Sequence, residues 1–430
     1  TSLVLLDRDA QVWLRQNRQE RPQGHARVPG PVAVAERPLS QPQNPKQAGA
    51  IGDPLSALDT PCLVIDLAAF EQNLDRLMQS VADTKVTVRP HAKSHKCPEI
   101  AKRQIARGAV GICCQKISEA QAFADAGIND ILLSNELVGS KKIAAALSLA
   151  RQLQARSGQL TLCVDHPQAA ADLNHAAQAA GLRIPVLIEL DVGQHRCGVA
   201  NPRAAVALID QVHRSSGLQF KGLQAYHGSA QHTRSQADRQ AAIDQACHLI
   251  TRVQRDAAAL GIDCATVTGA GTGSYLLEAQ SGVYTEVQPG SYALMDVDYG
   301  RNDWGQSDMP VFENSLFIHT SVMSRPDDRA VVDAGLKSMS VDSGPPVILG
   351  HPEWLYQKAS DEHGVIVAST QTGQPAQPNE LVGRLPALGQ TLLLVPGHCD
   401  PTVNLYDVLH VMNQGVLVDV WPISARGLLF

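Results

Sequence analysis

From Thr60 onward, the chain alternates short β-prone apolar runs with longer segments whose apolar residues recur at helical spacing. TPCLVID predicts a first strand, and LAAFEQNLDRLMQSV predicts a helix after it. Eight further β runs follow, at 85–91, 110–115, 130–135, 159–165, 185–191, 220–226, 264–271 and 285–292. Ala- and Leu-rich helical stretches separate most of these runs, which indicates parallel βα units. Eight units favour a closed (β/α)8 barrel of the TIM type, with an open doubly wound sheet as the alternative.

After Arg301 the helical segments disappear from the pattern. Runs such as FENSLFIHTSVMS, QTLLLVPGH and GVLVDVWPISARG alternate apolar and polar positions between turn residues, which predicts a β domain. Residues 1–56 are instead rich in Pro, Gln and Arg, a composition that buries little surface. We therefore expect an α/β protein with an extension or linker at 1–56, a barrel at 57–303, and a smaller, mostly β C-terminal domain at 304–430.

Composition and charge restrict the class of partner. The chain has 430 residues, 44% of them hydrophobic and only 18% charged, so a large core can form. Its formal net charge of −6 offers no basic excess for nucleic acid, and no apolar run is long enough to span a bilayer. The nine cysteines form no C-x-x-C pair, which predicts reduced, mostly buried thiols and a cytoplasmic location. Organelle targeting through the Arg-rich N-terminal segment stays open, although acidic residues such as Asp7, Asp9, Glu20 and Glu36 argue against it.

Candidate chemistry lies at the ends of the predicted barrel strands, where active sites of such barrels are built. Those ends supply Lys93, Gln115, Asn135, Asp165, Arg196, Tyr226, the glycines of GAGTGS, and Gly290. The stretch RPHAKSHK makes Lys93 a candidate Schiff-base lysine. Partial burial and a neighbouring cation such as Arg89 would lower the pKa of its amine. Lys96 is an equally good candidate on this pattern, and an ordinary rim lysine is the plainer alternative.

Two further motifs have ligand-binding character. GAGTGS (269–274) lies between an apolar strand and a short helical run, so its backbone N–H groups could bind a phosphate. A plain tight turn is the alternative. PGHCDP (396–401) closes the strand TLLLV, and an extended backbone would point His398 and Asp400 to one side as a two-residue metal anchor. Such a site favours Mn²⁺ or Mg²⁺, whereas Cys399 as the second ligand would favour Zn²⁺.

Seven motifs occur together in order: RPHAKSHK, GICCQKISEAQAFADAG, GAGTGSY, EVQPGSYALMD, VVDAGLK, SDEHG and PGHCDPT. Together they resemble the D-threonine aldolase and D-serine dehydratase group, pyridoxal 5′-phosphate (PLP) enzymes with the alanine racemase fold. The resemblance extends from about Thr60 to Gly427. Within the group, the chain is similar to the aldolases that act on D-threonine or 3-hydroxyaspartate. A homodimer is expected, because in this fold type the β domain of one chain faces the partner's barrel.

The resemblance implies residues that hold PLP, a catalytic base and a divalent metal. Lys93 would bind the cofactor covalently, and its other contacts would come from Gln115, Arg196, Tyr226, Gly271, Thr272, Gly273 and Ser274. Arg196 would face the phenolic oxygen of PLP, and the glycine turn would bind the phosphate. His232 would be the catalytic base. His398 and Asp400 would bind the metal, and because dehydratases of the group typically have Cys at the position of Asp400, the aspartate favours an aldolase.

The expected activity is retro-aldol cleavage of a D-3-hydroxy amino acid to glycine and an aldehyde. A metal on His398 and Asp400 would acidify the β-hydroxyl, and His232 would remove its proton. The alternative is a D-serine or D-threo-3-hydroxyaspartate dehydratase, in which Lys93 removes the Cα proton and a 2-oxo acid and ammonia form. A racemase needs two opposed bases and no metal, and a non-catalytic cofactor carrier would lack the β domain, so both fit the motifs less well.

Overall fold

The computed structural model describes residues 47–305, 312–369 and 385–430. Eight parallel strands curl into a TIM-like barrel in the order β2-β9-β8-β7-β6-β5-β4-β3. A parallel bridge between His91 and Cys113, with a hydrogen bond from Val110 N to Val88 O, joins the two ends of this order. The predicted barrel is thereby confirmed. Its strands are β2 (Thr87–Val88), β3 (Ile112–Cys114), β4 (Asp130–Glu136), β5 (Gln159–Val164), β6 (Ile184–Glu189), β7 (Leu218–Ala225), β8 (Thr266–Gly269) and β9 (Glu286–Val287).

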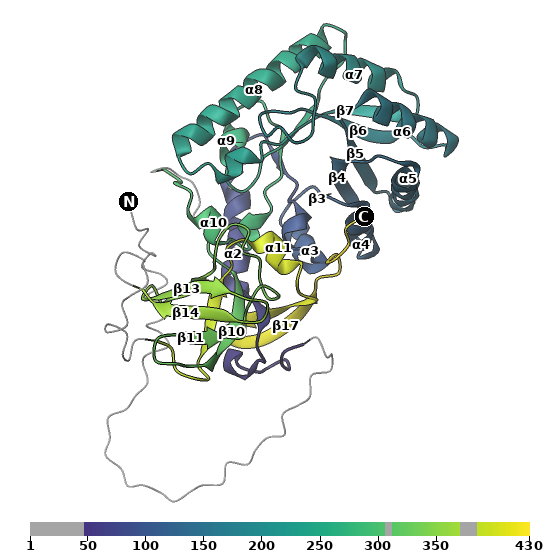
Figure 1. Cartoon of the computed structure of the whole chain (residues 1–430). Helices are drawn as coiled ribbons and strands as arrows, with labels where there is room; N and C mark the ends of the chain where they lie inside the picture. Colours follow the sequence, from purple (N-terminus) through teal and green to yellow (C-terminus); the bar gives the residue numbers. More distant parts are fainter. Residues whose placement is uncertain (1–46, 306–311, 370–384) are drawn as a thin grey trace, which may run out of the picture.

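Helices follow most barrel strands and cover the outside of the barrel (Figure 1). In α7 the apolar positions Ala205, Leu208, Ile209 and Val212 recur at helical spacing and are buried against the strands. The α-helices are α2 (Leu67–Ser80), α3 (Pro98–Ala106), α4 (Ile117–Asp125), α5 (Ser140–Gln154), α6 (Pro167–Ala179), α7 (Pro202–Arg214), α8 (Gln236–Ala258), α9 (Tyr275–Gln280), α10 (Val297–Gly300) and α11 (Cys399–Val403). The 3-10 turns are η1 (Leu55–Ala57), η2 (Ala92–Ser94), η3 (Ser229–His232) and η4 (Ser291–Ala293).

The second sheet has nine strands and forms the predicted mostly β domain. Its strands are β1 (Cys62–Asp66), β10 (Leu316–Ser324), β11 (Ala330–Val332), β12 (Val347–Ile348), β13 (Trp354–Ala359), β14 (Gly364–Ala368), β15 (Thr391–Val395), β16 (Val408–Asn413) and β17 (Val416–Pro422). The first of these, β1, pairs antiparallel with β10 and parallel with β16, although it precedes the barrel in the sequence. The first predicted strand is therefore part of the β domain. It belongs by sequence to the segment 57–303 that was predicted to form the barrel, but it pairs with strands of the segment 304–430.

Residues 47–56, the described end of the predicted N-terminal extension, lie against the same sheet. The backbone N–H groups of Gly52 and Leu55 donate to the carbonyls of Leu417 and Gly415. The rest of the predicted extension, 1–46, lies outside the described residues. No helix in the described ranges is long and apolar enough to cross a membrane.

The core is divided between the two domains. One cluster fills the space between barrel strands and outer helices, and a second joins α2 and α3 to the β domain. Inside the barrel lie Cys113, Leu132, Cys163 and Leu187. All nine cysteines are free, and seven are buried, as the sequence predicts.

Candidate active site

A cavity of about 240 Å³ opens at the carboxyl ends of the barrel strands. Six residues predicted to contact the cofactor line it: Lys93, Gln115, Arg196, Tyr226, Gly271 and Thr272. They come from segments that follow β2, β3, β6, β7 and β8, so the parallel register of the barrel brings distant parts of the chain together. The remaining wall includes His91, Ser134, Gln224, Gln288, Ser291 and Tyr299.

Lys93 lies in η2, the short turn that follows β2, and its amine faces the β domain. The imidazole of His91 caps this turn by accepting a hydrogen bond from Lys93 N. The Lys93 Nζ lies 2.5 Å from Asp400 Oδ2, in the first turn of α11. With 40% of its side chain exposed, Lys93 remains accessible from the cavity, while Asp400 is largely buried.

The environment of Lys93 differs from the one predicted. Burial lowers the pKa of its amine, but the carboxylate of Asp400 and the phenol of Tyr226 outweigh burial, so the pKa is raised above its ordinary value. Arg89 exerts no opposing effect, because its side chain binds Asp130 and Glu286 at 2.7 and 3.0 Å within the barrel. The expected lowering of the pKa by Arg89 is therefore wrong for the chain without cofactor.

Lys96, the other lysine of this segment, does not line the cavity. Its amine lies 3.3 Å from the buried carboxylate of Glu119. Glu119 also accepts hydrogen bonds from the backbone N–H groups of Gln115 and Lys116. Lys96 thus stabilises the start of α4, and Lys93 is the lysine that a bound molecule would meet.

The GAGTGS turn divides into two halves. Gly271 and Thr272 line the cavity, and their backbone N–H groups have no acceptor among the described residues. Gly273 N instead donates to Gln231 Oε1 at 2.9 Å, and Ser274 Oγ donates to the buried carboxyl of Glu278 at 2.8 Å. Of the four residues predicted to contact the phosphate, Gly271 and Thr272 therefore line the cavity. Gly273 and Ser274 do not line it and instead stabilise the turn through hydrogen bonds to Gln231 and Glu278.

A cation, a phenol and a neutral imidazole also line the cavity. The guanidinium of Arg196 lies 5.8 Å from the ring centre of Tyr226. Gln115 Nε2 lies 2.9 Å from His91 Nε2 and donates to the Ser134 carbonyl at 3.2 Å. Burial, with Lys93 nearby, holds the pKa of His91 well below its ordinary value, so this ring stays neutral.

His232 ends the η3 turn beside the cavity without lining it. Its Nδ1 lies 2.5 Å from Asp298 Oδ2, and its ring centre lies 5.8 Å from that of Tyr299, which does line the cavity. Arg234 binds Asp298 through both the carboxylate and the backbone carbonyl. Hydrogen bonds from Arg234 and the proximity of His232 outweigh burial and lower the pKa of Asp298. Asp298 therefore remains ionised and orients His232 through Nδ1, while Nε2 has no hydrogen-bond partner in the described part of the chain.

His398 is the extended N-cap of α11, and Asp400 lies in the first turn of this helix, so the segment does not stay extended as the same-side arrangement of the two residues requires. His398 Nδ1 lies 2.8 Å from Asp342 Oδ2. Asp400 Oδ1 accepts a hydrogen bond from Ser291 at 3.1 Å, and its Oδ2 faces Lys93. Burial raises the pKa of Asp400, but Lys93 and His398 outweigh it and lower the pKa below its ordinary value. Cys399 is fully buried, so it is a poorer candidate ligand than either neighbour.

The two remaining strand-end candidates do not line the cavity. Asn135 donates to the carbonyl of Gln115 at 2.9 Å, and Asp165 accepts from Gly198 N at 3.0 Å. The sequence analysis missed several site residues: His91, Gln224, Gln288, Ser291, Asp298, Tyr299 and Asp342. Asp298 and Tyr299 follow the last predicted barrel run, so their place at a strand end was a signal that could have been used.

The residues present fit a PLP molecule. An accessible amine, a guanidinium, a phenol and two backbone N–H groups without acceptors line one cavity. This set matches an aldehyde, an acidic phenol and a phosphate. For a divalent cation the fit rests on the chemistry of the donors: His398 and Asp400 provide one imidazole and one carboxylate, of the kinds that bind such ions.

Comparisons with known proteins agree with this geometry. The family described as alanine racemase, N-terminal domain, matches residues 65–297, and a putative serine dehydratase domain matches residues 315–412. A D-threonine aldolase from Arthrobacter sp. is 50% identical, covering 87% of this chain and 95% of that protein. A 3-hydroxy-D-aspartate aldolase from Paracoccus denitrificans is 42% identical, covering 86% and 93%.

A solved structure supports the same conclusion. The crystal structure of D-threonine aldolase from Filomicrobium marinum superposes with a TM-score of 0.84 at 44% identity, covering 89% of this chain and 100% of that one. The resemblance seen in the seven motifs is thereby confirmed. The chain is a lyase and belongs to the D-threonine aldolase family, which joins an alanine racemase-type barrel to a serine dehydratase-type β domain.

Proposed function

We propose that this chain cleaves a D-3-hydroxy amino acid, of the D-threonine or 3-hydroxyaspartate type, to glycine and an aldehyde. The cofactor would be PLP on Lys93, assisted by a divalent cation on His398 and Asp400. The observation that carries the proposal is the 2.5 Å approach of Lys93 Nζ to Asp400 Oδ2. It brings the proposed cofactor lysine and a proposed metal ligand together, although they are 307 positions apart and lie in different domains.

The two absent groups would supply complementary chemistry. When bound, PLP supplies an electron sink for the pair released as a bond to Cα breaks. A divalent cation supplies Lewis-acid stabilisation of negative charge on the β-oxygen. Oxygen and nitrogen donors favour Mn²⁺ or Mg²⁺ here, with Zn²⁺ as the alternative.

The residues of the cavity would bind and orient. Gly271 and Thr272 would donate their backbone N–H groups to the phosphate, and Arg196 would face the phenolic oxygen. Gly273 and Ser274 would fix the turn through Gln231 and Glu278 rather than contact the phosphate directly. Tyr226 and Gln115 would close the remaining walls.

His232 would move the proton of the β-hydroxyl. Because Nδ1 lies against the ionised carboxylate of Asp298, Nε2 is the nitrogen available to accept a proton. The carboxylate would then stabilise the positive ring that forms. Loss of that proton is what cleavage of Cα–Cβ requires, since the β-carbon must become a carbonyl.

Assembly and compartment belong to the proposal as well. A homodimer is expected from the family resemblance, with the β domain of one chain facing the partner's barrel. A cytoplasmic location is consistent with nine free thiols. Neither nucleic acid nor a membrane is a proposed partner.

One assay tests the reaction. Pure protein with PLP and Mn²⁺ is incubated with D-threonine, and glycine, acetaldehyde, 2-oxobutyrate and L-threonine are measured. Equal amounts of glycine and acetaldehyde are expected. If 2-oxobutyrate forms alone, the chain is a dehydratase, and if L-threonine forms alone, it is a racemase. Either result would overturn the aldolase proposal.

A further inference from the structure

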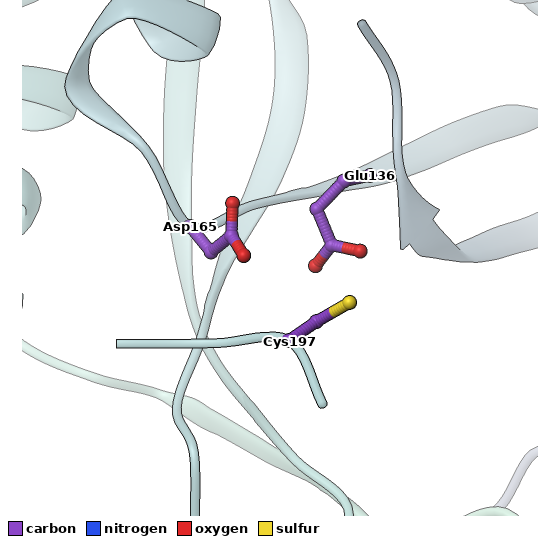
Figure 2. Close-up of side chains that lie close together, drawn as sticks. All are labelled: Glu136, Asp165 and Cys197. Atoms are coloured by element: carbon purple, nitrogen blue, oxygen red, sulfur yellow. The ribbon is translucent and has the colours of Figure 1, made fainter. Parts of the chain in front are cut away.

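A second group of potential ligands lies on the rim of the barrel, outside the proposed metal pair. Glu136 ends β4, Asp165 follows β5, and Cys197 lies in the loop after β6. One ligand atom from each of these three side chains lies within 4.8 Å of the other two. Figure 2 shows the two carboxylates and the thiol turned toward one another.

The neighbouring side chain of Glu189 provides an independent observation. Glu189 ends β6 and is only 6% exposed, yet its carboxyl accepts no hydrogen bond from a donor group in the described residues. It contacts the carboxyl of Glu136 instead, and Glu136 Oε1 is itself buried without a hydrogen-bond partner. Burial and the facing carboxyl of Glu136 raise the pKa of Glu189. The guanidinium of Arg196 partly offsets this effect on Glu189, and the Cys197 thiol can donate to Glu136. Two buried carboxyls that face each other still favour a proton or a further cation between them.

We propose that Glu136, Asp165 and Cys197 bind a divalent cation of the zinc type. The neighbouring carboxyl of Glu189 would add negative charge close to the ion. Thiolate and carboxylate ligands about 2.0–2.3 Å from a tetrahedral zinc ion lie roughly 3.5 Å from one another. Because the ligand atoms lie within 4.8 Å of one another, the side chains need to close by at most about 1.3 Å. The thiol proton is released to solvent when the ion binds, as for other cysteine ligands.

The site would act on the loop that carries Arg196. This loop has left-handed backbone at Gly193, His195 and Gly198, and Asp165 already holds it by accepting from Gly198 N. A cation on Cys197 would tie the loop to β4 and to the end of β5. Arg196, the residue before Cys197, lines the cavity, so the ion would hold that guanidinium in place. The inference concerns metal binding and does not depend on the proposed reaction.

Cobalt(II) is the probe, because a cobalt–thiolate bond gives a charge-transfer absorption that carboxylate and imidazole ligands do not. The PLP-loaded Asp400→Ala protein is titrated with Co²⁺, which removes one ligand of the proposed metal pair; Cys399 keeps its thiol, so the thiolate band is assigned by its response to Cys197→Ser. We expect about one bound equivalent and a thiolate band. Cys197→Ser in the same background should abolish the band, and Glu136→Gln should weaken binding about tenfold or more.

Cys247→Ser is the matched control, since Cys247 is also a partly buried free thiol but lies on α8. It should keep both the band and the stoichiometry. Circular dichroism and cofactor absorption verify that each variant is folded. The proposal is overturned if the Asp400→Ala protein binds no Co²⁺, or if the band survives Cys197→Ser in folded protein.

Discussion

The amine of Lys93 and the carboxylate of Asp400 meet 2.5 Å apart across the junction between the barrel and the β domain. Lys93 is fixed by the η2 turn after β2, and Asp400 by the first turn of α11. Each group stabilises the charged form of the other, since the pKa of the lysine is raised and that of the aspartate is lowered. Covalent attachment of a cofactor to Lys93 would free this carboxylate to bind a cation.

Replacing the lysine tests the cofactor assignment. Lys93→Ala should lose the visible absorption of covalently bound PLP and reduce activity by about 10³-fold or more, because no other amine lines the cavity in the described structure. Lys102→Ala, a change at an exposed lysine on α3, should leave both unchanged. Absorption spectra and turnover measure the effect. Retention of the cofactor band by Lys93→Ala would assign PLP to another lysine.

Removing the aspartate tests the proposed metal pair. Asp400→Ala should abolish stimulation by Mn²⁺ while cofactor absorption persists, because the carboxylate would bind the cation and not PLP. The exposed turn residue Asp361 provides the control, and Asp361→Ala should respond to Mn²⁺ like the parent. Turnover is measured against Mn²⁺ concentration after chelation. Undiminished stimulation in Asp400→Ala would exclude this residue as a ligand.

The contact between His232 and Asp298 predicts a positioning effect. Asp298→Asn keeps the shape but removes the charge that orients Nδ1 and stabilises the protonated ring, so kcat should fall about 10²-fold with a smaller change in KM. The pH dependence of kcat should shift as well, which a purely structural defect would not cause. Asp210→Asn, on α7, is the control. An unchanged pH profile would separate Asp298 from the proton transfer.

Glu278 predicts a pH-dependent stability. Its side chain is fully buried behind the phosphate turn, and burial raises its pKa to about 7 from an ordinary value of 4.5. Because the folded pKa is the higher one, the stabilisation is complete below pH 4.5 and is lost as the pH rises through 7. Glu278→Gln removes this dependence, and its glutamine can still accept from Ser274.

The measurement is denaturant unfolding of parent and Glu278→Gln proteins at pH 5 and pH 8. Relative to the parent, the variant should gain about 2–3 kcal/mol between the two pH values. A parallel response of the two proteins would show that Glu278 titrates normally. Glu362→Gln serves as the control, since the carboxylate of Glu362 lies on the surface, paired with Lys337.

The barrel was predictable because its signals are local. Each βα unit carries an apolar run, a helical period and a polar strand end, and eight consecutive units leave few arrangements. The same logic found Lys93, Gln115, Arg196 and Tyr226, since carboxyl ends of parallel strands meet at one rim.

Long-range pairing was not predictable in this way. Nothing in the periodicity near Cys62 distinguishes a barrel strand from the partner of β10 and β16. PGHCDP gave no sign that a helix would start at Cys399, so the extended backbone that would point His398 and Asp400 to one side ends at His398. The predicted lowering of the Lys93 pKa by Arg89 was also wrong, because the Arg89 side chain binds the carboxylates of Asp130 and Glu286 elsewhere in the barrel.

The position of β1 has a consequence for biogenesis. This strand leaves the ribosome before any part of the barrel, yet both of its neighbours, β10 and β16, are made only after the barrel. Its edges must wait unpaired while the barrel is synthesised, so the β domain can assemble only after the barrel has been made. A nascent chain arrested after the barrel would expose β1, which makes that stage the one most prone to aggregation and to chaperone capture.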